Sequence, residues 1–200
     1  MNPRDDVACP FVGMLLNTKR IPHKNISRET FMKAISDLNI FDESMLFLIQ
    51  SGILKPFLDS NGNIGNITDI NNAEHDISLS RLDSCNGNSI IFNQEHFCKL
   101  LEISADSIYL TLDDIVKFRK KILRESIKPK FDIREKFISS GEDAFLQLLF
   151  SDHTGKIRVD WLQYFFKKAK LPNKKLGYKR RKISAIDFIA TVLIHFIKLQ

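Results

Sequence analysis

Residues 111–124 read TLDDIVKFRKKILR, and this stretch indicates the fold class. Ile115, Phe118 and Ile122 recur at intervals of three and four residues, which places them on one face of a helix. Two aspartates lie near the start, where the positive end of the helix dipole favours acidic side chains. The pattern predicts an amphipathic helix from Thr111 to Arg124.

The same helical spacing of apolar residues recurs along most of the chain. Further helices are predicted over residues 10–16, 44–49 and 184–198, after caps at Ser27 and Asn93, and after Gly141 and Gly155. Residues 60–72 are rich in Asn, Gly and Asp and are predicted to form a loop. No alternating strand pattern and no internal repeat occurs in the sequence. We therefore expect a mostly α fold, with a single compact multi-helix domain over residues 1–200.

The composition is typical of a soluble globular protein, with 44% hydrophobic and 27% charged residues. The net charge of +6 is unevenly spread: residues 1–100 hold 9 basic and 12 acidic side chains, or −3, which leaves +9 for the second half. Nine Lys or Arg fall within residues 167–182 without one Asp or Glu. Such a run can contact phosphates or anionic lipid, but a solvated helix end and loop is the simpler interpretation.

The three cysteines, Cys9, Cys85 and Cys98, are an odd number with irregular spacing. Because none forms a C-x-x-C pair, the pattern argues against a zinc site and a dense disulfide framework, and leaves room for one functional thiolate. Residues 1–10 lack the apolar segment of a signal peptide, and residues 183–199 are too polar for a membrane span. We expect either a protein that acts inside the cell or an incomplete N-terminus.

Cys9 is followed by Pro10, a residue favoured in the first turn of a helix. Cys9 is therefore expected at the N-cap, with the backbone N–H groups of Phe11 and Val12 directed towards its sulfur. Those donors and the positive helix end would lower the thiol pKa and hold a thiolate. A thiolate suits a ferric heme iron, because it donates electron density that helps to cleave an O–O bond. The alternative is a buried, inert cysteine.

The segment EHDISLSRLD, residues 74–83, concentrates acid–base groups directly after the predicted loop. Glu74 and Asp76 flank His75, and two carboxylates in this position can bind a hard cation or orient the imidazole for proton transfer. A hydrogen-bonded turn that caps a helix explains the same composition equally well.

Together these motifs resemble the heme-thiolate peroxidase family, the group that includes chloroperoxidase and the unspecific peroxygenases. Cys9-Pro10 followed by Leu16-Asn17 is similar to the family's opening, which reads Pro-Cys-Pro, a short helix and Leu-Ala-Asn-His-Gly. Residues 74–83 resemble its Glu-His-Asp-x-Ser-x-Ser-Arg-x-Asp signature, and residues 86–97 resemble the continuation. The later landmarks are Ser140-Gly141-Glu142, Phe165-Phe166, Leu171-Pro172 and Gly177-Tyr178. The matches occur in the family's order and cover nearly the whole chain.

The resemblance implies a cofactor and a cation. Cys9 would be the axial ligand of the iron in heme b. Glu74, Ser78 and the backbone carbonyl of His75 would bind Mg2+ or Mn2+ together with a heme propionate, which agrees with the preference of hard cations for oxygen ligands.

The resemblance also implies the residues on the peroxide side of the heme. Glu142 would be the distal acid–base residue, with His75 as its hydrogen-bond partner and Asp76 beside it. We expect Glu142 in the first turn of the helix that follows Gly141, where the helix dipole favours the ionised carboxylate.

The implied function is the oxidation or oxygenation of a small organic substrate, or of a halide, by hydrogen peroxide. A heme-binding protein without turnover is the first alternative. A basic binding module that uses residues 167–182 is the second, and no nucleic acid partner is expected. A monomer and a homodimer are both compatible with the sequence. The chain departs from the family at Ala8, at Thr18-Lys19, at Ala169-Lys170 and at Tyr178.

Overall fold

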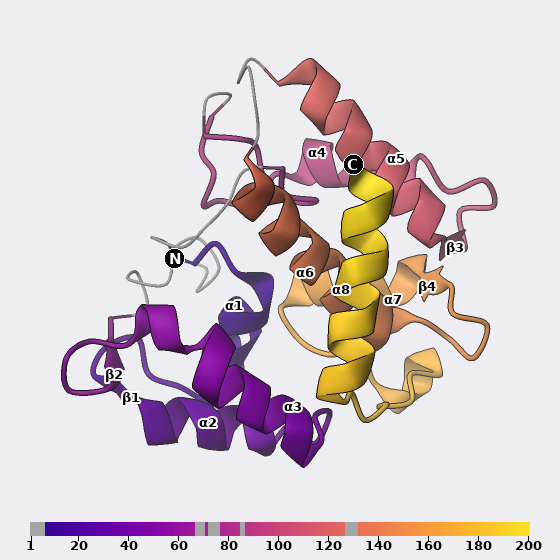
Figure 1. Ribbon diagram of the computed structural model, residues 1–200. Coiled ribbons are helices and arrows are strands. Elements are labelled where there is room, and N and C mark those ends of the chain that lie inside the picture. Colours follow the sequence, from indigo (N-terminus) through magenta and orange to yellow (C-terminus); the bar gives the residue numbers. More distant parts are fainter. Residues whose placement is uncertain (1–6, 67–70, 72–76, 85–86, 127–131) are drawn as a thin grey trace.

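The computed structural model describes residues 7–66, 71, 77–84, 87–126 and 132–200. Most of these residues are helical, so the predicted mostly α fold is confirmed (Figure 1). The helices are α1 (Pro10–Asn17), α2 (Arg28–Ser36), α3 (Glu43–Leu48), α4 (Gln94–Leu101), α5 (Leu112–Glu125), α6 (Ile133–Phe150), α7 (Val159–Lys168) and α8 (Ala185–Leu199). Short helical turns are η1 (Ile49–Ile53), η2 (Lys55–Phe57) and η4 (Lys174–Leu176).

Four of the predicted helix starts are set by side-chain caps, whereas the helix predicted from Ser44 starts at Glu43, after a cap formed by Asp42. Ser27, Asn93 and Ser184 each accept a hydrogen bond from the backbone N–H three residues later. Thr111 and Asp114 form a reciprocal capping box at the start of α5. These caps satisfy backbone donors that have no partner within the helix, which is why these four starts were recognisable in the sequence.

The prediction that a helix starts after Gly141 is wrong. α6 begins at Ile133, eight residues before Gly141, after a capping box formed by Asp132 and Glu135. Gly141 therefore lies in the interior of the helix. A glycine inside a helix costs only about 1 kcal/mol relative to alanine, and packing of α6 along α8 offsets that cost. Glu142 is therefore a mid-helix residue, and the expected support from the helix N-terminus is absent.

Four short strands were not predicted: β1 (Ile26–Ser27), β2 (Asn63–Gly65), β3 (Tyr109–Leu110) and β4 (Ile157–Arg158). β1 pairs with β2 and β3 with β4, both antiparallel. Segments of two or three residues are too short to show an alternating pattern, so the sequence carried no signal for them.

Aromatic side chains join the first helix to the long helices of the C-terminal half. The Phe11 ring of α1 lies 5.9 Å from the Phe145 ring of α6, and Phe145 lies 5.0 Å from Phe188 of α8. Trp161 of α7 is buried and donates from Nε1 to the carbonyl of Leu176 at 2.8 Å. The start of α1 is thus packed against α6, the helix that carries Glu142.

No helix in the described part of the chain combines the length and the apolar character needed to cross a bilayer.

Candidate functional site

Cys9 occupies the N-cap of α1 with Pro10 in the first turn, as the sequence predicted. Its side chain is half-buried. The sulfur accepts no capping hydrogen bond from the helix, so the expected donation from Phe11 and Val12 is not formed. An extended backbone at Cys9, with φ −72° and ψ 114°, accompanies this arrangement. The position at the positive helix end remains favourable for a thiolate, but the capping donors do not contribute.

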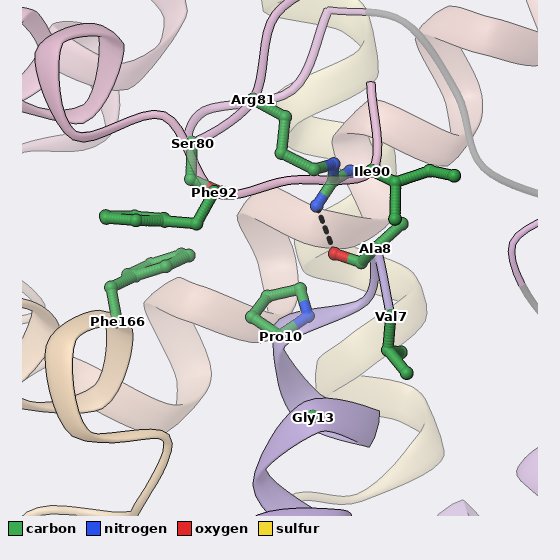
Figure 2. A pocket seen from close by; sticks show the side chains of 9 residues that line it. All are labelled: Val7, Ala8, Pro10, Gly13, Ser80, Arg81, Ile90, Phe92 and Phe166. Atoms are coloured by element: carbon green, nitrogen blue, oxygen red, sulfur yellow. Dashed lines mark hydrogen bonds between the residues drawn. The ribbon is translucent and has the colours of Figure 1, made fainter. Parts of the chain in front are cut away.

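Arg81 of the signature segment contacts Ala8, the residue that precedes Cys9. Arg81 is buried, at 3% exposure, and its Nη1 donates a hydrogen bond to the carbonyl of Ala8 (Figure 2). The backbone N–H of the same residue, Ala8, donates to Oδ1 of Asn71 at 2.9 Å. Two motifs about 70 residues apart in the sequence are therefore joined in space by a charged hydrogen bond.

The backbone of the signature is strained at Ile77. This residue has φ +65°, a conformation that β-branched side chains rarely adopt, and its side chain is fully buried. The Ile77 N–H donates to Oδ1 of Asp83 at 2.6 Å, and Asp83 is itself buried. The surrounding contacts thus hold an unfavourable conformation, a situation that is concentrated at functional sites.

Ser78 is buried and lies between two partners. Its hydroxyl accepts a hydrogen bond from the Ser80 N–H at 3.3 Å, and its carbonyl lies 2.9 Å from Nε2 of His96. Because a carbonyl only accepts, His96 carries its proton on Nε2. Burial lowers the pKa of His96 from its ordinary value of 6.5, while the Ser78 carbonyl and Asp83 act in the opposite direction.

We predict that His96 makes the fold less stable in mild acid. Its folded pKa is depressed, so the stabilisation is complete above about pH 6.5 and is lost as the pH falls below it, where the unfolded chain binds the proton more readily. Urea unfolding above and below that pH would measure the slope of the unfolding free energy against pH. His96→Gln should flatten it, whereas Cys98→Ala on the same helix should keep the wild-type slope. Equal slopes for His96→Gln and wild type would contradict the prediction.

The proposed cation ligands Glu74 and His75, and the proposed catalytic residues His75 and Asp76, lie outside the described residues. Of that predicted set the structure describes Ser78 and Glu142. Within the described ranges, no group of three His, Cys, Asp or Glu side chains is arranged to hold a metal ion. The Mg2+ or Mn2+ site formed by Glu74, Ser78 and the His75 carbonyl stays a prediction.

Glu142 is held by a buried arginine. Nη2 of Arg119 lies 2.8 Å from Oε2 of Glu142 and 2.6 Å from Oδ1 of Asp143, and also donates to the Ser139 carbonyl at 3.2 Å. The Arg119 side chain is 0% exposed, whereas that of Glu142 retains 12% exposure. One guanidinium from α5 therefore pairs with two successive carboxylates of α6, and the side chain of Glu142 keeps some exposure although its Oε1 atom is buried.

α8 completes this buried charged cluster through His195. Its Nε2 lies 2.7 Å from Oε1 of Gln147, and its Nδ1 lies 3.5 Å from Oδ2 of Asp143. Burial alone would raise the pKa of Asp143, yet Arg119 and His195 hold it below its ordinary value. Burial alone would lower the pKa of Arg119, yet Asp143 and Glu142 raise it. Arg119 and Asp143 therefore both stay ionised across the ordinary pH range.

Arg119, His96 and His195 were not predicted as site residues from the sequence. Arg119 carried a signal: it falls four residues after Ile115 and three before Ile122, on the apolar face of its helix. An arginine at such a position is expected to be paired, because burying an unpaired charge is very costly. His96 and His195 carried no comparable signal, since their partners are distant in the sequence.

A cavity of about 20 Å³ lies beside the start of α1 (Figure 2). Its lining includes Ala8, Pro10 and Gly13 of the cysteine segment, Arg81 of the signature, and the stacked rings of Phe92 and Phe166. Gly13 is buried, and a Cβ added there would meet no heavy atom within 4 Å. This volume holds about one water molecule and is far too small for a heme.

Two of the described residues have the chemistry that a heme would need, although the cavity beside α1 does not enclose one. A single soft sulfur donor at a helix N-terminus suits an axial ligand of heme iron, and the buried Arg81 is the kind of cation that pairs with a carboxylate such as a propionate. The Cys9 side chain is half-buried, so it is not enclosed within the core.

The sequence model of the family described as Peroxidase, family 2, matches residues 7–183. The chain belongs to this family. The match begins just before Cys9, includes the signature segment and Glu142, and ends just before α8. A search of curated proteins gave no match. Membership of peroxidase family 2 supports a peroxide-dependent oxidoreductase, which agrees with the class expected from the sequence.

Proposed function

We propose that this member of peroxidase family 2 is a heme-thiolate enzyme, with Cys9 as the axial iron ligand and Glu142 as the distal acid–base residue. The observation that carries the proposal is the hydrogen bond from Arg81 to Ala8, which joins the signature segment to the Cys9-Pro10 motif. This contact brings two segments that both resemble the family's motifs to the same place in the fold.

Heme, when bound, supplies the redox chemistry that cleaves the O–O bond of peroxide and oxidises the substrate. The protein supplies the ligand and the surroundings. Cys9 would donate its thiolate, and Glu74, Ser78 and the His75 carbonyl would hold the cation at a propionate. Since the cavity beside α1 holds only about one water molecule, it does not enclose the macrocycle, and heme loading would require side chains to move.

Glu142 would take a proton from hydrogen peroxide at a carboxylate oxygen and return it to the oxygen that leaves as water. The ion pair with Arg119 favours the ionised carboxylate that this first step needs. Asp143 is engaged by both Arg119 and His195, so Glu142 is the member of the pair that retains exposure. His75 and Asp76 are proposed as its partners on the basis of the family signature.

The substrate is proposed to be a small organic molecule or a halide, with hydrogen peroxide as the oxidant. Hydroxylation, one-electron oxidation and halide oxidation all use the same ligand and acid–base residue, so the proposed assignments of Cys9 and Glu142 do not depend on which one occurs.

The test of the proposal is the absorption spectrum of the heme-reconstituted protein, reduced under carbon monoxide. Wild type should show the long-wavelength Soret band of a thiolate-ligated heme, and Cys9→Ala should lose it. The matched control is Cys98→Ala, a half-buried cysteine of α4, which should keep the wild-type spectrum. A protein that binds no heme, or a band that is unchanged in Cys9→Ala, would refute the proposed ligand.

The Glu142–Arg119 ion pair also favours one alternative, a heme-binding protein without turnover. A carboxylate stabilised by a buried guanidinium accepts a proton less readily than one in an apolar pocket. A thiolate-type spectrum together with no peroxide consumption would identify this alternative.

A further inference from the structure

The outer face of α8 is apolar and uncovered. Ile186 is 79% exposed and Ile197 is 71% exposed, and between them lie three further exposed residues at helical spacing, Ile189, Leu193 and Ile194. The opposite face, with Phe188, Val192, His195 and Leu199, is buried against the protein. Figure 1 shows α8 on the outside of the molecule, with no element over the side that faces the viewer. A helix that is apolar on both faces exposes more apolar surface than a stable monomer in water normally does.

The apolar surface extends onto the neighbouring helix α6. Phe137 is 51% exposed, and its ring centroid lies 5.9 Å from that of Phe196 on α8. Ile133, one turn earlier on α6, is 71% exposed. The exposed face of α8 and these α6 residues form what we call the α8 surface.

A strongly basic segment leads directly into this helix. Residues 167–182 contain nine Lys or Arg and no acidic residue, and all nine are exposed. Across the described part of the chain, none of the nine lies within ion-pair distance of a carboxylate. Arg180 and Lys182 instead donate to the backbone carbonyls of Leu38 and Phe41, at 2.9 and 3.4 Å, which fixes this end of the segment to the body of the protein.

We propose that the α8 surface and the basic segment together dock the protein on an anionic lipid membrane, with α8 lying in the plane of the interface. An exposed apolar helix face beside a cluster of Lys and Arg is the combination that binds such surfaces, because apolar side chains enter the acyl boundary while cations contact lipid phosphates. A second copy of this chain complements the surface less well, because it brings the same nine cations and no matching anionic segment. The surface is independent of the proposed heme chemistry, and α8 lies beyond the residues matched by the family.

The test is sedimentation of the full chain with phosphatidylcholine vesicles, with and without phosphatidylserine. Wild type should bind the anionic vesicles at least about tenfold more tightly, and salt should weaken the binding. Ile186→Ser/Leu193→Ser should weaken binding by about tenfold or more through lost apolar contact. Lys179→Glu/Arg181→Glu should do the same through charge. The matched control for charge is Lys24→Glu/Lys33→Glu, which alters two exposed lysines elsewhere and should retain most of the binding.

Circular dichroism of each variant would confirm folding, and the changed residues are exposed in the structure. Failure of wild type to bind anionic vesicles would overturn the proposal, as would equal loss in the Lys24→Glu/Lys33→Glu control. Light scattering would measure whether the protein forms a dimer. A dimer that Ile186→Ser/Leu193→Ser separates, without vesicle binding by wild type, would assign the α8 surface to self-association instead.

Discussion

Replacing Arg119 with methionine is expected to lower the free energy of unfolding by about 3–5 kcal/mol, the cost of breaking a buried ion pair by removing one partner. Arg119 is 0% exposed and forms ion pairs with both Glu142 and Asp143. Methionine has a similar length but no charge, so Asp143 would remain as a buried carboxylate without its arginine partner, with Nδ1 of His195 at 3.5 Å. Because α5, α6 and α8 each contribute to the cluster, the loss should affect the whole C-terminal half.

Urea unfolding at neutral pH would measure the effect. The matched control is Arg134→Met on α6, an exposed arginine, which should change the unfolding free energy by no more than about 0.5 kcal/mol. Arg119→Lys should fall between the two, because lysine keeps the charge but cannot donate to both carboxylates in the same planar geometry. An equal unfolding free energy for Arg119→Met and Arg134→Met would contradict the prediction, because it would show that the two carboxylates are stable without their cation.

Local chemistry made the helices predictable. Ser27 and Asn93 are hydrogen-bonding side chains that precede an apolar helical pattern, and each forms the cap that the sequence indicated. Gly141 led to a wrong helix start, because a glycine in a sequence looks the same whether it lies next to a helix or within one. The capping box at Asp132 decided the start of α6, and packing against α8 made the glycine tolerable.

The candidate site was less predictable because its contacts are not local. Cys9 was placed at its N-cap by the proline that follows it, but the direction of its sulfur depends on tertiary contacts that spacing does not encode. The hydrogen bond from Arg81 to Ala8 spans 73 residues, and the ion pair from Arg119 to Asp143 spans 24. Arg119, a charged residue on the apolar face of α5, indicated that a partner must exist. Its partners, Glu142 and Asp143, could be identified only from the structure.

Changing Glu142 to glutamine is expected to reduce peroxide turnover of the heme-loaded protein by about 10²–10⁴-fold, the usual contribution of a positioned acid–base residue. Glutamine keeps the length and an oxygen that can accept from Nη2 of Arg119, while Asp143 still balances the arginine charge. The fold and the thiolate-type spectrum should therefore be preserved. What is lost is a carboxylate that can accept the proton of peroxide and return it to the departing water.

Peroxide consumption and carbon monoxide spectra, measured on the same heme-reconstituted samples, would separate turnover from cofactor binding. Glu125→Gln, which removes an exposed carboxylate at the end of α5, is the matched control and should keep wild-type turnover. A Glu142→Gln protein with a normal spectrum and undiminished turnover would assign proton transfer to another group, with His75 and Asp76 the next to be replaced. A variant that keeps its spectrum but loses turnover would instead place Glu142 at the reacting peroxide, and would show that a mid-helix carboxylate paired with a buried arginine can still exchange a proton.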